Sequence, residues 1–147
     1  MKTISNMKGL QQEVSPVITG LVDRLAKEVY QTLNYFLEEY YSGWTPTSYK
    51  RTGAFLRAAV KVDAESYGNG VRAIVCIDYK ALDDYVNATG YQVADWANKG
   101  LHGGLSVSHK LYVWDDTMDE TIHNNSLLRL AVAYLEKKGI PVIEKGI

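Results

Sequence analysis

The longest regular pattern of apolar positions runs from residue 16 to residue 40. Apolar side chains recur there at intervals of three and four, which places them along one side of an α-helix of about seven turns. Ser15 and Pro16 are typical of a helix start, with serine as the N-cap and proline in the first turn. We therefore expect a long amphipathic helix from residue 16, preceded by an N-terminal arm at residues 1–15.

Two shorter stretches have the period of two that is typical of β-strands. Over residues 56–63, Val60 and Val62 belong to an apolar set of positions, and Lys61 belongs to the alternate, more polar set. This alternation predicts a strand with its valine side buried and its lysine side in water. Residues 71–79 form a second apolar stretch, and the turn residues at 66–70 join the two stretches into a hairpin.

The second half of the chain is less regular. Residues 91–99 suit a short helix that Gly100 closes, and residues 107–114 alternate as a third strand. Thr117 and Glu120 have the spacing of a capping box, which marks the start of the last helix. That helix ends at Lys137–Gly139, and residues 140–143 suit a short edge strand.

Elements in this order predict an α+β fold. We expect a long N-terminal helix, a small antiparallel sheet of 3–4 strands, and a C-terminal helix packed on one face of that sheet. Neither an internal repeat nor a linker divides residues 16–147, so these residues are expected to form a single domain.

Charge and composition exclude several classes of protein. The formal net charge is −1, from 16 basic and 17 acidic residues, and no basic stripe marks a general nucleic-acid binder. No apolar run is long enough to span a bilayer, and the N-terminus lacks the apolar core of a signal peptide. The single cysteine, Cys76, excludes a disulfide framework and fits a cytosolic product.

The candidate catalytic residues lack the spacing that catalysis or metal binding requires. His102, His109 and His123 form no metal-binding motif, and Ser106 belongs to no nucleophile motif. We therefore predict neither enzymatic activity nor a cofactor. A small His/Asp metal-dependent hydrolase that uses His102 and His109 is the weakest of three hypotheses.

Aromatic residues point to protein contacts instead. The chain has 11 tyrosines and three tryptophans but only two phenylalanines. Tyr and Trp combine a large apolar surface with a polar tip, and they are enriched in protein–protein interfaces. This composition favours a protein that assembles with other proteins.

The order of elements and a local motif resemble a known family. The stretch Pro46-Thr-Ser-Tyr-Lys-Arg-Thr-Gly53, followed by Leu56-Arg57 before the hairpin, is similar to the tail-completion and head–tail joining (neck) family of long-tailed bacteriophages. Tyr40-Tyr41 ahead of this stretch, and Trp96 ahead of Gly100-Leu-His-Gly-Gly104, also resemble members of that family. The resemblance covers most of residues 16–138.

The resemblance implies a structural subunit of a ring at the phage neck or upper tail, without catalytic residues. Its partners would be copies of itself and adjacent neck or tail proteins, with no membrane, and DNA would meet it only inside the ring lumen. It would be located in the virion, and in the host cytoplasm during assembly. The long helix is one expected interface, and further interface candidates are Tyr40, Tyr41, Trp44, Tyr49, Arg51, Trp96 and His102.

Two alternatives stay open at this point. Each candidate interface residue is as well suited to packing within the subunit as to contacts between subunits. A prophage-encoded module that binds a host protein is the second functional hypothesis.

Overall fold

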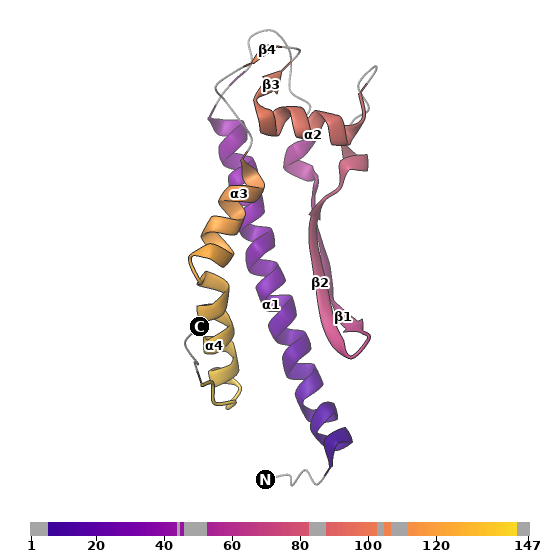
Figure 1. The fold of residues 1–147 in the computed structure, drawn as a ribbon, viewed down its shortest axis with the longest axis vertical. Helices are drawn as coiled ribbons and strands as arrows, with labels where there is room; N and C mark the ends of the chain where they lie inside the picture. The colour runs from indigo at the N-terminus through magenta and orange to yellow at the C-terminus, as the bar shows by residue number, and fades with distance from the viewer. Residues whose placement is uncertain are drawn as a thin grey trace.

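The structure is a computed structural model that describes residues 6–43, 45, 53–82, 88–102, 105–106 and 112–143. The molecule is elongated, and the first helix forms its long axis (Figure 1). This helix, α1, extends over Met7–Ser42 and contains 36 residues. At 1.5 Å per residue it is about 54 Å long.

The predicted start of α1 at Ser15–Pro16 is wrong. Asn6 is the N-cap, and its side-chain oxygen accepts a hydrogen bond from the Gly9 N–H at 2.8 Å. Most residues of the first turns, such as Met7 and Leu10, are good helix formers, so the helix begins two turns earlier and Pro16 lies inside it. Asn6 is a stronger start signal than Pro16 because it directly satisfies an unpaired amide of the first turn.

The predicted hairpin is confirmed. Its strands are β1, Ala59–Tyr67, and β2, Gly70–Ile77, which pair in antiparallel orientation. A short 3-10 helix, η1 (Phe55–Arg57), precedes β1. Gly68 has a φ of 57° in the tight turn, a conformation that glycine adopts without steric cost. The register is irregular between Val62 and Glu65, where β1 contains a bulge.

Beyond the hairpin, the chain forms a short 3-10 helix, η2 (Tyr79–Ala81), and then α2 (Gly90–Lys99). The prediction of α2 is confirmed, and Gly100 closes it with a φ of 73°. Thr89 caps its start, with a reciprocal hydrogen bond to Gln92. The two-residue strands β3, Leu101–His102, and β4, Leu105–Ser106, follow as a separate pair.

The C-terminal segment departs from the prediction. Residues 107–111 of the predicted third strand lie outside the described part, and Val113 and Trp114 belong to a helix, α3 (Val113–Met118). Thr117 is therefore inside a helix and not its cap. Its buried hydroxyl donates a hydrogen bond to the Val113 carbonyl at 2.6 Å, so its polar group is satisfied within the helix. A π-helical turn, η3 (Asp119–His123), leads to α4 (Ser126–Lys137), and no strand forms at 140–143.

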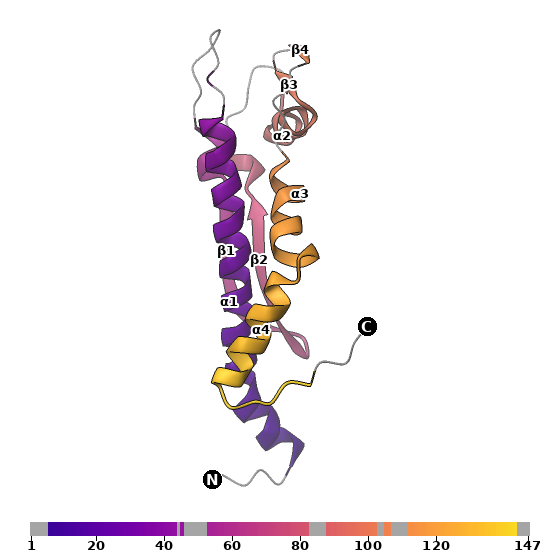
Figure 2. The same cartoon turned by 90° about the vertical axis from the view of Figure 1, so that its left-hand side faces the viewer.

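The elements pack around α1. The hairpin lies along one side of α1, while α3, η3 and α4 lie along another side (Figures 1 and 2). The α+β class is confirmed, but the main sheet has two strands within the described residues instead of the expected 3–4. The C-terminal helices pack mainly on α1 and not on the sheet, because the inner face of this narrow sheet is occupied by α1 itself.

The hydrophobic core lies where the C-terminal half of α1 meets the base of the hairpin, α2 and α3. Leu33 and Leu37 of α1 are fully buried there. Phe55, Ile77 and Val113 contribute from η1, β2 and α3. Toward the hairpin tip the molecule is thinner, so apolar side chains of the strands have fewer neighbours to cover them.

Candidate functional site

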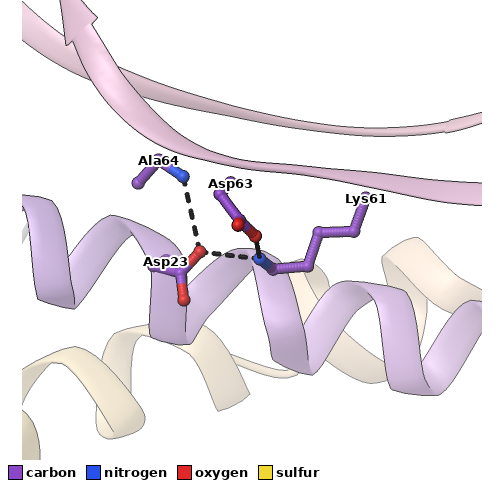
Figure 3. Close-up of polar contacts among 4 residues, drawn as sticks. All are labelled: Asp23, Lys61, Asp63 and Ala64. Carbon is purple, nitrogen blue, oxygen red and sulfur yellow. Dashed lines mark hydrogen bonds and ion pairs between the residues drawn. The ribbon is translucent and has the colours of Figure 1, made fainter.

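A three-residue polar cluster attaches the hairpin to α1 (Figure 3). The Lys61 ammonium group lies 2.6 Å from an Asp23 carboxylate oxygen on α1 and 2.6 Å from an Asp63 oxygen on its own strand. The same Asp23 oxygen accepts a hydrogen bond from the Ala64 N–H at 3.4 Å. Asp23 therefore contacts β1 through both a side chain and the backbone of the bulge.

These contacts shift the pKa of both partners in the direction of an ion pair. The hydrogen bond from Lys61 is the main cause that lowers the pKa of Asp23, with a smaller contribution from the Ala64 amide. The hydrogen bonds to Asp23 and Asp63 raise the pKa of Lys61. Both shifts favour the charged forms, as expected for an ion pair that joins the hairpin to α1.

The orientation leaves apolar side chains on the outside of the hairpin. Because successive strand residues point to opposite faces, the residues next to Lys61 point away from α1. Val60 pairs with Cys76 and Val62 pairs with Ile74, so these four residues share one surface, which we call the outer face. Val60, Val62 and Ile74 are 36%, 43% and 40% exposed.

A charged and aromatic group borders the outer face near the hairpin tip. Arg72 of β2 donates to Glu65 of β1 at 3.0 Å, and its guanidinium lies 3.9 Å from the centre of the Tyr67 ring. Tyr67 is 61% exposed. An apolar centre with a rim of Arg and Tyr is the composition that protein–protein interfaces favour.

The structure places the predicted interface residues in different regions. Tyr40 and Tyr41 lie at the end of α1 with ring centroids 5.6 Å apart, and both are half-buried against the core. Their position matches packing within the subunit. Trp96 is 41% exposed on α2. For His102 the structure describes the backbone in β3, and Trp44, Tyr49 and Arg51 lie outside the described residues.

The two sides of β1 are the reverse of those that the sequence pattern predicts, and the outer face was not among the predicted surfaces. Val60 and Val62 were expected to be buried and Lys61 to face water, whereas the Lys61 side chain is only 14% exposed. Alternation shows that two sides differ, but it does not show which side meets the helix.

The described part of the chain forms no metal-binding group. Across these segments, no three His, Cys, Asp or Glu side chains are placed to hold a metal ion. His123 pairs with Asp119 one helical turn earlier, at 2.5 Å, and both are exposed. His109 lies outside the described residues. The structure therefore does not test the hydrolase hypothesis at this position, and the lack of a metal-binding motif in the sequence remains the argument against it.

A wide polar groove runs between α1 and the η3–α4 junction. Its volume is about 700 Å³, and Glu28, Tyr35, Glu39 and Glu120 are among the lining residues. Nearby, burial and the neighbouring carboxylates of Asp115, Asp119 and Glu39 raise the pKa of Asp116. The groove is open and mostly polar, unlike the largely apolar and enclosed pockets that usually hold small molecules. A membrane-crossing segment is also not found among the described helices, which lack an apolar run of sufficient length.

Comparison with known proteins gives one finding. The family model named YomN matches residues 6–137, which is most of the chain. Neither the curated proteins nor the solved structures contain a significant match.

Proposed function

We propose that this chain, which belongs to the phage-associated YomN family of the SPβ-prophage type, is a ring-forming structural subunit of the virion. Its place would be the phage neck, as a tail-completion or head–tail connector protein. The family membership supports a role in a phage, and the finer location follows from the resemblance of residues 16–138 to neck proteins. Its partners would be copies of itself and the adjacent neck or tail proteins.

The outer face is the observation that carries the proposal. Val60, Val62 and Ile74 form a contiguous apolar surface on a sheet that the rest of the described chain leaves uncovered. An apolar centre with aromatic and arginine residues at its border is the composition that protein–protein interfaces favour. Covering what remains exposed of each side chain would contribute on the order of 1 kcal/mol. A subunit repeated around a ring would gain this contribution in every copy whose outer face an adjacent neck or tail protein covers.

The direct test is to image purified virions and assembled tails and to measure their protein content by mass spectrometry. We expect this chain in multiple copies, as a ring between the head and the tail tube. Absence of the chain from the particles would refute the proposal. Recovery of a host protein with the chain would then favour the binding-module hypothesis.

A pair of matched variants connects the test to the outer face. Ile74→Lys places a charge at the centre of that face, and Leu128→Lys does the same at a 56% exposed leucine on α4. Burying an unpaired charge costs more than 1.4 kcal/mol, so we expect at least about tenfold less Ile74→Lys protein in particles. Leu128→Lys should be incorporated like the unmodified chain, and circular dichroism should show both variants folded.

A further inference from the structure

The hairpin has two open edges. In the part of the chain that the structure describes, β1 pairs only with β2, and β2 pairs only with β1. A two-stranded sheet is marginally stable by itself, and an unpaired edge is a template for pairing with another strand. Each hairpin therefore presents two unpaired strand edges in addition to its outer face.

The direction of the edge amides follows from the register. The Asp78 N–H donates to the Ala58 carbonyl at 2.7 Å, and the two-residue turn joins the directly opposed Tyr67 and Gly70. Hydrogen-bonded and non-bonded pairs alternate along an antiparallel ladder. The alternate residues of β2 consequently direct their N–H and C=O groups away from the hairpin; they are Val71, Ala73, Val75 and Ile77.

The edge of β2 carries little that would prevent pairing. Natural edge strands are protected by proline, by several charges or by bulges. In β2, Arg72 is the one charged residue, no proline occurs, and the register bulge lies on β1 between Val62 and Glu65. The segment Ala59–Val62 of β1 is regular and lies opposite Ile74–Ile77 of β2.

The charged residues of β1 and β2 favour pairing between two different edges. The exposed charges of β1 are acidic, Asp63 and Glu65, with side chains 91% and 55% exposed, whereas the exposed charge of β2 is Arg72. Two β1 edges would bring acidic residues together, and two β2 edges would bring arginines together. A β2 edge beside a β1 edge repeats the Glu65–Arg72 complementarity that the hairpin already contains.

The geometry points to a head-to-tail junction in which the β2 edge of one copy pairs with the β1 edge of the next copy. This inference rests on the proposed function, and it names the surfaces that join the subunits. Rotation about an axis parallel to the strands makes β2 antiparallel to the neighbouring β1, so successive hairpins form one antiparallel sheet. Such a junction uses two different surfaces of each copy and closes into a ring when the rotation closes. The outer faces then become one apolar surface of the ring.

Thiol cross-linking distinguishes this junction from the alternatives. The unmodified chain carries one thiol, Cys76 on β2, and a Cys76→Ser/Val60→Cys chain carries one thiol on β1. The two thiols are kept on separate chains because positions 60 and 76 face each other within one hairpin. Assemblies of the purified chains, and particles that contain them, are oxidised so that thiols in direct contact form a disulfide, which requires Cα atoms about 4.4–6.8 Å apart. The same position on a neighbouring copy would be two strands away, about 9.6 Å, and would not form one.

We expect cross-linked dimers when the two chains are mixed and almost none when either chain is used alone. Dimers of the unmodified chain alone would show β2 against β2, and dimers of the Val60→Cys chain alone would show β1 against β1. Either result, or the absence of cross-links in assemblies of the mixture, would overturn the inference. If neither the purified mixture nor the particles contain an assembly of the chain, the inference also fails.

A second test removes one edge amide. Ala73→Pro deletes an N–H that points away from the hairpin, and proline is tolerated at such edge positions. Ala73→Ser is the matched control because it retains the amide. We expect equal circular dichroism for both variants and at least tenfold weaker assembly of Ala73→Pro. Equal assembly of two folded variants would contradict the junction.

The two proposals fail in different ways. If the chain forms a ring in particles but positions 60 and 76 do not cross-link between copies, the junction is wrong and the proposed function stands. If the mixed chains cross-link in purified assemblies while particles lack the protein, the proposed function is wrong and the junction stands.

Discussion

The ammonium group of Lys61 lies 2.6 Å from the carboxylate of Asp23, which is 38 residues earlier in the chain. This contact joins the middle of β1 to α1 and turns the lysine side of the strand inward. Val60 and Val62 then lie on the outer face, where they are available to a partner. One ion pair between distant residues thus connects the fold to the surface on which the proposed function depends.

Stability should depend on pH through this ion pair. A carboxyl whose pKa is lowered by folding stabilises the folded state above its ordinary pKa, and the contribution is lost as the pH falls through the lowered value. For Asp23 the loss begins below about pH 4. The pKa of Lys61 is raised by folding, so its contribution to stability is present at lower pH and is lost as the pH rises above about 10.4.

We therefore expect Asp23→Asn to lower the urea midpoint at pH 7 and to reduce the acid dependence between pH 4 and pH 2. Asp63→Asn is the control, because it removes the 91% exposed carboxylate but leaves the contact between α1 and β1. Equal effects of the two substitutions would show that attachment to α1 is not the source of the stabilisation.

The crossing of α1 and α4 depends on Gly20. A Cβ atom at this position would lie 2.3 Å from the Tyr134 hydroxyl oxygen but 3.5 Å from the ring carbon that carries it. Alanine is favoured over glycine in a helix by up to about 1 kcal/mol. Gly20→Ala should therefore stabilise the protein only in a chain that also carries Tyr134→Phe, which removes the hydroxyl. A double-mutant cycle by urea unfolding should give a coupling energy of about 1 kcal/mol or more, and additive effects would contradict the contact.

Gly90 allows α2 to approach η2 closely. An added Cβ would lie 2.0 Å from the Tyr79 carbonyl oxygen and 2.9 Å from the Leu82 Cβ. Backbone atoms cannot rotate away, so Gly90→Ala should destabilise the protein by about 1–3 kcal/mol, as overpacking does elsewhere. Gly70→Ala is the control, since its nearest atom would be 3.9 Å away. Thermal unfolding of both variants measures the difference.

Leu33 tests the position of the core. Its side chain is fully buried in the cluster between α1, η1 and β2. Leu33→Ala should lower the free energy of unfolding by about 2–5 kcal/mol. Leu128→Ala, at a 56% exposed position, should change it by less than about 0.5 kcal/mol. Urea unfolding measures both variants, and equal losses of stability for Leu33→Ala and Leu128→Ala would show that Leu33 is not part of the core.

Several predictions from the sequence are confirmed because their causes are local. The spacing of apolar residues produced the long helix, and the turn at Gly68 produced the hairpin. The left-handed Gly100 and Gly139 close α2 and the C-terminal helix where expected. The prediction of a cap at Thr117 is wrong, because its hydroxyl donates to the Val113 carbonyl inside a helix that begins earlier, although its spacing to Glu120 fits a capping box.

The predicted interface residues lie in different surroundings. Of the interface candidates, Trp96 is exposed, whereas Tyr40 and Tyr41 pack against the core. The outer face was missed because Val60 and Val62 have the composition of a buried strand face. No property of residues 56–63 alone shows which of the two faces of the strand packs against α1 and which stays exposed.

By itself, the sequence determined the α+β class, the long helix and the hairpin. These follow from interactions between residues close in the chain. Only the tertiary structure decided that Lys61 faces α1, that the C-terminal helices pack on α1, and that the sheet has two strands in the described part. Each of those outcomes depends on contacts between segments far apart in sequence, and the periodicity of one segment carries no information about which distant surface will cover it.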